Sequence, residues 1–323
     1  MASAHLQCRY RPYRHRQCRQ PDWPCSISKH GSTGGGARMK LSICTISFRH
    51  QLVSIDQLVN WARANHFQGI ELWGVHAKNL AEQPSYNKDW LAGFGLSASM
   101  ISDYLPLQGP ETAAFQKVQQ LCLLAKHWGA TKLRTFASNL GSHQVTETER
   151  QDITRRMRDI CQWTAQHGIT LIVEIHPGTL ADTMASTLRL LEDVNQPNLK
   201  INFDVLHVWE SGADPVEAFQ LLKPEIEHFH LKNISSADLL SVFSPPNVYS
   251  ASGSREGLVP LFEGAVDYQR FLEYVMQQPD SKFHHMDASL EWFGDQCKQT
   301  LSQDRYNIQR LEQQFDLPQR IVN

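Results

Sequence analysis

The stretch Leu171-Ile172-Val173-Glu174-Ile175-His176-Pro177 organises the predicted fold of this chain of 323 residues. Its short apolar run is rich in branched side chains and ends at Pro177-Gly178, which is typical of a buried parallel strand. Glu174 and His176 are two residues apart, so their side chains point to the same side of the sheet. Because a buried strand does not normally carry an acid and a base without partners, we expect a chemical site at this strand end.

Three later strands repeat the pattern of an apolar body with a polar side chain at or near its end. They are Lys200–Asp204 with Asp204, Ile226–Leu231 with His230, and Asp287–Trp292 with Glu291. Together with Glu174 they offer three carboxylates and one imidazole, a donor set that suits Mn²⁺ or Mg²⁺, with Co²⁺ and Zn²⁺ as alternatives. We therefore predict that Glu174, Asp204, His230 and Glu291 bind one divalent metal ion.

Strand and helix signals alternate along the chain from Met39 onward. Eight strands are predicted, at Leu41–Ser47, Gly69–Trp73, Leu96–Ser102, Thr131–Phe136, Leu171–Pro177, Lys200–Asp204, Ile226–Leu231 and Asp287–Trp292. Eight strand–helix units in about 280 residues predict an α/β fold, a (β/α)8 TIM barrel, whose active sites lie at the carboxyl ends of the strands. A doubly wound sheet is the alternative, but no G-x-G-x-x-G motif follows the first strand.

Helix signals and one long connection complete this pattern. The segments Ser54–Gln57 and Thr146–Glu149 have the spacing of capping boxes, and the apolar spacing over Glu111–Trp128 predicts a helix. The segment Asn233–Gly264, which follows the seventh predicted strand, is unusually long for a connection in a compact domain. Long loops of this kind are usually functional, so we expect a lid over the site.

Charge and cysteine usage exclude several classes of protein. The formal net charge is −2 with 15 histidines, which argues against a nucleic-acid partner. None of the seven cysteines forms a C-x-x-C pair, which indicates a reducing, cytoplasmic setting. No apolar stretch is long enough to cross a bilayer. We expect a cytoplasmic protein with a small-molecule partner and no membrane contact; homo-oligomerisation stays open.

The first 38 residues differ from the rest of the chain. Met1–Arg38 is rich in arginine and has no apolar periodicity. We interpret residues 1–38 as a disordered N-terminal extension ahead of a natural start at Met39, and residues 39–323 as the catalytic domain.

Three residues near the strand ends are candidates for proton transfer and charge stabilisation. His176 lies further out than Glu174 on the same side, so it is free to act as a base, with an ionisation expected near neutrality. His207 follows Asp204 just beyond its strand, with a surface loop histidine as the alternative interpretation. Lys232 shares the side of His230 and could neutralise an oxyanion or a carboxylate.

Three further residues are candidates for contacts with a substrate. Arg134 should face the mouth of the barrel and could clamp a carboxylate with two hydrogen bonds. Tyr104 offers a phenol at the end of the third predicted strand. Glu71 is a candidate ligand, but pairing with Arg134 or Lys232 or support of another ligand explains it as well.

Several segments resemble one known family. They are Cys44–His50, Gly69–Gly74, Met100–Tyr104, Arg134–Ala137, Asn198–Pro215, Lys232–Tyr249 and Ser289–Gly294. These pieces look like the bacterial 3-dehydroshikimate dehydratases, within the xylose-isomerase-like, sugar phosphate isomerase/epimerase barrel superfamily. The resemblance runs from Met39 to about Gly294, and the superfamily's divalent-metal site matches Glu174, Asp204, His230 and Glu291.

The resemblance implies a lyase, more narrowly a hydro-lyase, that converts 3-dehydroshikimate to protocatechuate (3,4-dihydroxybenzoate) for catecholate siderophore biosynthesis or aromatic catabolism. His176 would remove the proton beside the ketone, and Arg134 or Lys232 would hold the ring carboxylate. A ketose or sugar-phosphate isomerase or epimerase with the same metal site is the alternative. A DNA-repair endonuclease barrel would need further histidine ligands and a basic face that this chain lacks.

Overall fold

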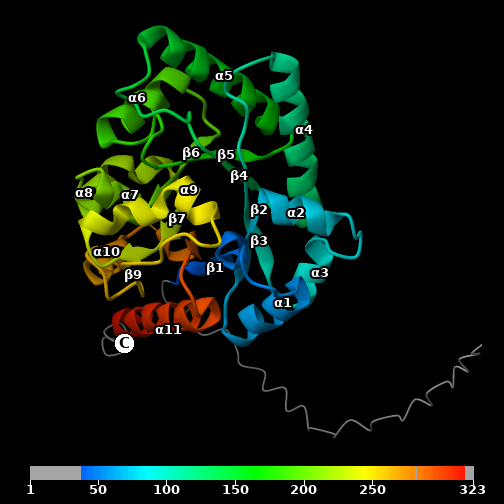
Figure 1. The fold of residues 1–323 in the computed structure, drawn as a ribbon. Helices are drawn as coiled ribbons and strands as arrows, with labels where there is room; N and C mark the ends of the chain where they lie inside the picture. The colour runs from blue at the N-terminus through cyan, green and yellow to red at the C-terminus, as the bar shows by residue number, and fades with distance from the viewer. Residues whose placement is uncertain (1–37, 281, 317–323) are drawn as a thin grey trace, which may run out of the picture. The chain divides into compact units, whose positions relative to one another are not determined.

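The computed structural model describes residues 38–280 and 282–316, so the predicted extension lies outside the described residues apart from Arg38. Within the described part of the chain, eight parallel strands close into a barrel in the order β1-β10-β7-β6-β5-β4-β3-β2 (Figure 1). These strands are β1 (Lys40–Cys44), β2 (Gly69–Trp73), β3 (Ser97–Ser102), β4 (Lys132–Thr135), β5 (Thr170–Glu174), β6 (Leu199–Asp204), β7 (Ile226–Leu231) and β10 (Asp287–Leu290). The predicted (β/α)8 barrel is confirmed.

Helices surround the strands (Figure 1). They are α1 (Ile55–Ala64), α2 (Gly74–Ala81), α3 (Lys88–Gly93), α4 (Glu111–Trp128), α5 (Glu147–Ala165), α6 (Met184–Val194), α7 (Val205–Glu210), α8 (Pro215–Leu222), α9 (Pro245–Tyr249), α10 (Tyr268–Met276) and α11 (Cys297–Asp316). The capping box before α5 is complete, because Glu149 N donates to Thr146 Oγ1 at 3.3 Å and Thr146 N donates to Glu149 Oε2 at 2.8 Å. At α1, Gln57 N donates to Ser54 Oγ at 3.2 Å. The short helices α2 and α7, which start directly at strand ends, were not anticipated.

Four predicted strands run too far at their carboxyl ends: the fourth ends at Thr135, the fifth at Glu174, and the other two are the first and the eighth. The first ends at Cys44, where a 3-10 helix over Thr45–Phe48 begins, and the eighth ends at Leu290. Hydroxyls of this 3-10 helix replace strand pairing: Trp73 N donates to Thr45 Oγ1 at 2.9 Å, and Trp292 N donates to Ser47 Oγ at 3.0 Å. The backbone therefore leaves the ladder at the mouth of the barrel without losing its hydrogen bonds.

A cluster of phenylalanines fixes the two strands that matter most for the site. Phe203 on β6 and Phe229 on β7 point outward and pack with Phe219 of α8 and Phe271 of α10, at centroid separations of 5.8 to 6.4 Å. All four are fully buried, and each contributes roughly 1.5–3 kcal/mol of burial free energy. Because side chains alternate along a strand, the next residues, Asp204 and His230, face the barrel interior.

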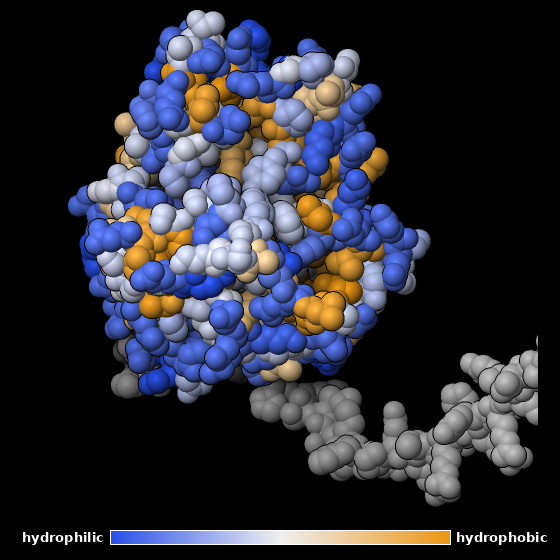
Figure 2. All heavy atoms as spheres, in the orientation of Figure 1, coloured by the Kyte–Doolittle hydropathy of each residue, from blue (hydrophilic) through white to orange (hydrophobic). Residues whose placement is uncertain are grey.

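Among the described residues, no helix has the length and apolar character to cross a membrane. On the face drawn in Figure 2, hydrophobic residues form separate patches in a mostly hydrophilic surface. The four described cysteines are buried and form no disulfide: Cys44, Cys122, Cys161 and Cys297.

Candidate active site

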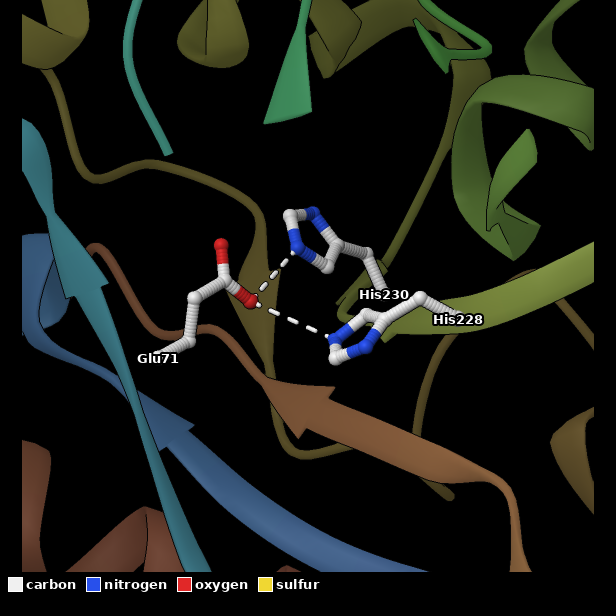
Figure 3. A group of neighbouring side chains, drawn as sticks. All are labelled: Glu71, His228 and His230. Atoms are coloured by element: carbon white, nitrogen blue, oxygen red, sulfur yellow. Dashed lines mark hydrogen bonds and ion pairs between the residues drawn. The ribbon is translucent and has the colours of Figure 1, made fainter. Parts of the chain in front are cut away.

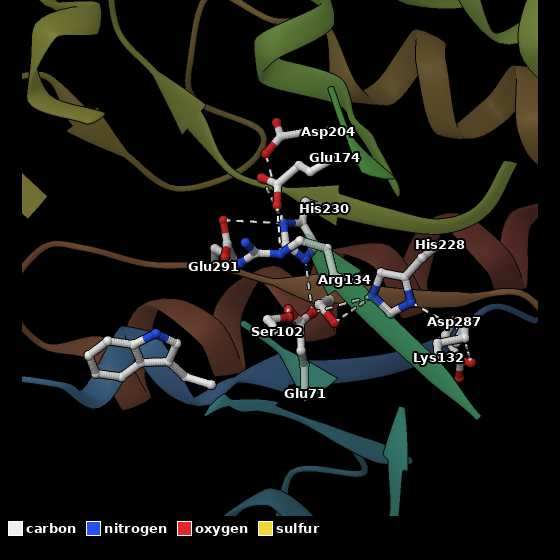
Figure 4. Close-up of polar contacts among 12 residues, drawn as sticks. Glu71, Ser102, Lys132, Arg134, Glu174, Asp204, His228, His230, Asp287 and Glu291 are labelled. Atoms are coloured by element: carbon white, nitrogen blue, oxygen red, sulfur yellow. Dashed lines mark hydrogen bonds and ion pairs between the residues drawn. The ribbon is translucent and has the colours of Figure 1, made fainter. Parts of the chain in front are cut away.

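Strand register brings the predicted metal ligands together at the carboxyl end of the barrel (Figure 4). Asp204 on β6 pairs with His230 on β7, and Glu174 is the last residue of the adjacent β5. Glu291 follows β10, where its N–H donates to Leu231 O at 3.1 Å. All four side chains are buried, with exposed fractions of 6% or less. Residues more than 100 positions apart therefore share one water-poor site.

The four side chains converge on one nitrogen atom. His230 Nδ1 lies 3.4 Å from Glu174 Oε1, 3.6 Å from Glu291 Oε2 and 3.9 Å from Asp204 Oδ2. This nitrogen is buried and has no hydrogen-bond partner among the described residues. An unsatisfied ring nitrogen facing three carboxylates is the arrangement that a divalent cation would complete.

The charges at the site lead to the same conclusion. Lys232 Nζ contacts Asp204 Oδ2 and lies 2.7 Å from Glu291 Oε2, and Arg134 Nε lies 3.0 Å from Glu174 Oε2. These two cations face four buried carboxylates: Glu71, Glu174, Asp204 and Glu291. Burial disfavours charge on His230, but the carboxylates around it outweigh that effect and raise its pKa well above the usual value. The donor set and its excess negative charge fit a divalent metal ion.

Glu71 lies below this cluster in Figure 4, and Figure 3 shows its carboxylate facing His228 and His230. It is fully buried, and its carboxylate accepts from Ser102 Oγ and lies 2.9 Å from His230 Nε2 and 3.4 Å from His228 Nε2. This placement favours the supporting role left open by the sequence over contact with a substrate. The site predictions did not include His228; its spacing of two residues from His230, which puts both on one side of a strand, was the available signal.

His176 lies in the loop after β5, enclosed by two rings. Its centroid is 4.5 Å from Phe136 and 4.5 Å from His207, and its Nδ1 lies 2.7 Å from Pro177 O. Since a carbonyl only accepts, Nδ1 carries the proton and Nε2 keeps a lone pair. Burial, reinforced by His207, lowers the pKa of His176 to about 3. The expected ionisation near neutrality is therefore wrong for this environment, and the ring is a neutral base.

His207 is a buried residue of α7, so the alternative of a surface loop histidine does not apply. Its backbone N–H donates to Asp204 Oδ1 at 3.1 Å, which caps α7 and orients the Asp204 carboxylate. Its Nδ1 lies 2.6 Å from Glu210 Oε2. Glu210 was absent from the site predictions, although its spacing of three residues from His207 on a helix would place both on one face.

Arg134 and Tyr104 lie at the wall of the pocket. Arg134 Nη1 is buried without a hydrogen-bond partner among the described residues, and its guanidinium lies 4.8 Å from the Phe136 ring centroid. Tyr104 is 45% exposed and its hydroxyl lies 2.5 Å from that of Tyr249. The pocket is lined by Ile46, Tyr104, Arg134, Phe136, Glu174, His176, His207, Lys232, Phe243, Pro245, Val248, Tyr249, Glu291 and Phe293. It combines an unpaired cationic donor with aromatic walls, which suits a flat carboxylate.

The segment Asn233–Gly264, for which the sequence predicts a lid, contributes Phe243, Pro245, Val248 and Tyr249 to the pocket lining. It contains a small antiparallel pair, β8 (Asn233–Ile234) with β9 (Leu258–Val259), and α9, which crosses in front of the barrel in Figure 1. Arg49 Nε donates to Val248 O at 2.6 Å, which ties α9 to the first strand's loop. An adjoining cavity of about 620 Å³ shares Tyr104, Phe136, His176, Pro245 and Tyr249 with the pocket.

Comparisons with known proteins agree with this geometry. The sequence profile of the xylose isomerase-like TIM barrel family matches residues 59–314. A 3-dehydroshikimate dehydratase of Bacillus anthracis is 49% identical over 269 residues, covering 81% of this chain and 94% of the relative. A crystal structure of the probable 3-DHS dehydratase involved in petrobactin synthesis from Bacillus anthracis is 48% identical, with a TM-score of 0.78 over 83% of this chain and 98% of that chain. An inosose dehydratase of Mesomycoplasma hyopneumoniae (strain J) is 26% identical over 241 residues, 69% of this chain and 77% of the relative.

Proposed function

We propose that this chain, which belongs to the xylose isomerase-like TIM barrel family, is a 3-dehydroshikimate dehydratase. It is a hydro-lyase that removes one water from 3-dehydroshikimate and forms protocatechuate. The observation that carries the proposal is the convergence of three carboxylates on His230 Nδ1 beside Arg134, whose Nη1 has no hydrogen-bond partner among the described residues. A chain 49% identical to a 3-dehydroshikimate dehydratase thus has both a metal-binding cluster and a donor for a ring carboxylate.

We assign the metal ion to Glu174, Asp204, His230 and Glu291, with Mn²⁺ or Mg²⁺ as the proposed ion because oxygen donors dominate the set. When bound, the ion would supply Lewis acidity that favours loss of the proton beside the ketone and stabilises the negative charge that develops. The substrate's ketone and neighbouring hydroxyl offer the oxygen atoms for such a site.

His176 is the proposed base. Its Nε2 lone pair faces away from the Pro177 carbonyl that accepts from Nδ1, so it is available to take the proton from the carbon beside the ketone. The same proton can return to the hydroxyl on the next carbon, which leaves as water as its C–O bond breaks. Loss of a ring proton and gain of one on the ketone oxygen then complete the aromatic ring.

Arg134 and Lys232 have separate proposed roles. Arg134 uses its buried Nη1 to bind the ring carboxylate. Its guanidinium lies 4.8 Å from the Phe136 ring centroid, and this contact helps to orient it. Burial opposes charge on Lys232, but Asp204 and Glu291 outweigh it and raise the pKa of Lys232 well above its usual value. Lys232 therefore stays an ammonium that hydrogen-bonds to substrate oxygens and does not act as a base.

Elimination is favoured over isomerisation by the number of free bases at the pocket. An epimerase moves a proton between two faces and needs two such groups. Here Glu174 contacts Arg134, and Glu291 contacts Lys232, while His176 lines the pocket with no carboxylate or cation bonded to its Nε2 among the described residues. One positioned base suits removal of a proton followed by loss of a hydroxyl.

We propose a biosynthetic role in catecholate siderophore formation, because a structure 48% identical is described as involved in petrobactin synthesis. Aromatic catabolism is the competing role for the same reaction. The four described cysteines, which are buried and form no disulfide, support a reducing, cytoplasmic setting.

The test is incubation of Mn²⁺-loaded protein with 3-dehydroshikimate while the ultraviolet absorbance of the catechol product is followed. We expect protocatechuate to form, activity to vanish after verified metal removal, and activity to return with Mn²⁺, Co²⁺ or Mg²⁺. No product from fully loaded protein would refute the proposed reaction.

Glu291→Gln should weaken metal binding while the fold persists. Glu147→Gln, at an exposed carboxylate, is its matched control and should leave metal binding unchanged.

A further inference from the structure

A chain of contacting polar side chains, buried except for the half-buried Asp287, runs from the proposed metal site to the amino-terminal end of the barrel strands (Figure 4). Lys132 Nζ, from the first residue of β4, lies 2.6 Å from Asp287 Oδ2 and 3.2 Å from His228 Nδ1. His228 Nε2 lies 3.4 Å from Glu71 Oε2, and His230 Nε2 lies 2.9 Å from the same oxygen (Figure 3). We call these five residues the core relay. Residues at this end of a TIM barrel usually serve stability alone.

The direction of each hydrogen bond in the core relay follows from the chemistry of its two ends. The ammonium of Lys132 has donors and no acceptor, so His228 Nδ1 must accept and the His228 proton is on Nε2. That N–H faces Ser289 Oγ at 2.8 Å and Glu71 Oε2. The Glu71 carboxylate accepts only, so His230 Nε2 carries a proton as well.

These directions leave Nδ1 as the nitrogen that His230 can offer to a metal ion, and this atom faces the carboxylates. They also argue against a second metal ion among Glu71, His228 and His230, although these three residues lie close enough to bind one. Because His228 Nδ1 accepts from Lys132, His228 Nε2 carries the proton, and a metal ligand needs a lone pair there.

We propose that Lys132, His228 and Glu71 are positioning residues that hold His230 in the tautomer able to bind the metal ion. This inference rests on the proposed assignment of His230 as a ligand. Lys132 lies at the amino-terminal end of the strands and contacts neither the metal ligands nor the pocket. It acts on His230 through His228 and Glu71. Groups that orient a ligating histidine typically change metal affinity by 10- to 100-fold when removed.

The test is Mn²⁺ binding by the full chain, with free Mn²⁺ measured by electron paramagnetic resonance, alongside thermal unfolding of the metal-free protein. We expect Glu71→Gln to weaken Mn²⁺ binding by about 10- to 100-fold and Lys132→Met by about 10-fold. Because Lys132→Met leaves Asp287 without its partner, the double variant Lys132→Met/Asp287→Asn repeats the measurement with both charges removed. It should lose the same affinity.

Lys200→Met is the matched control. Lys200 also lies near the start of a barrel strand and pairs with a carboxylate, Glu225 Oε2, at 2.5 Å, but the hydrogen bond of its ammonium goes to no histidine. We expect its Mn²⁺ affinity to equal that of the unchanged chain. An equal loss in Lys200→Met would mean that the effect is a general loss of stability, and the proposal would be wrong.

Glu291→Gln separates failure of this inference from failure of the proposed metal site. If Glu291→Gln weakens Mn²⁺ binding while Glu71→Gln and both Lys132 variants bind normally, the core relay has no positioning role and the ligand assignment stands. If none of these changes affects Mn²⁺ binding, both are wrong. Since the readout is Mn²⁺ binding, a failure to dehydrate 3-dehydroshikimate leaves this test intact.

Discussion

Replacement of His176 by alanine tests the proposed base most directly. The ring lies between Phe136 and His207, and its Nδ1–H donates to Pro177 O, so Nε2 is the free basic atom. Removal of a positioned general base usually costs a factor of about 10² to 10⁴ in rate. Burial and His207 lower the pKa of His176 to about 3, which makes it a weak base, so we expect the lower half of that range, about 10² to 10³ in kcat.

The pH profile follows from the same pKa. A histidine of ordinary pKa gains a proton as the pH falls through 6.5, but a pKa of about 3 keeps His176 neutral well below that point. With saturating metal and substrate, kcat of the unchanged chain should therefore show no fall from protonation of His176 between pH 7 and 5.5. The measurement is initial rates from catechol absorbance over this interval.

His176→Phe is the matched control for the alanine variant. Phenylalanine keeps an aromatic ring between Phe136 and His207 but offers no base, so we expect it to retain the melting temperature better than His176→Ala and to lose a similar factor in kcat. Metal binding should persist in both. Turnover near that of the unchanged chain in either variant would remove His176 from the mechanism and shift the role of base to His207.

Two further predictions concern the lid and the effect of pH on stability. Tyr249→Phe removes the hydroxyl contact with Tyr104, which is worth about 1 kcal/mol, so steady-state kinetics should show KM rising about fivefold. The control is Tyr86→Phe, which loses a hydrogen bond to Asp56 outside the pocket and should leave KM unchanged. Burial, reinforced by Glu263, raises the pKa of Asp304 from 3.8 to about 7, so its contribution to stability is lost as the pH rises through 7. Asp304→Asn should gain stability relative to the unchanged chain between pH 5 and pH 8, by at most about 3 kcal/mol in urea unfolding, and an equal difference at both pH values would contradict this.

The sequence by itself determined the barrel and the convergence of four residues on its rim. Strand period and chain order were sufficient, because parallel strands of a closed barrel present their carboxyl ends at one rim. Strands Gly69–Trp73 and Ile226–Leu231 and helix α4 have the predicted bounds. Local patterns specify these elements because apolar spacing and caps act within a few residues. Strand ends were less well predicted, because side chains such as Thr45 take over the backbone hydrogen bonds there.

Only the tertiary structure decided how the polar residues pair. Glu71 and His230 are separated by 159 positions, and no local pattern states that the carboxylate of β2 accepts from the imidazole of β7. The pKa of His176 is likewise a property of its surroundings, since burial and His207 lower it while its sequence neighbours give no such signal. Closure of the barrel brings distant strands within hydrogen-bond reach and excludes water from the space between them. The pairing of the buried charged side chains in that space therefore depends on the closed fold.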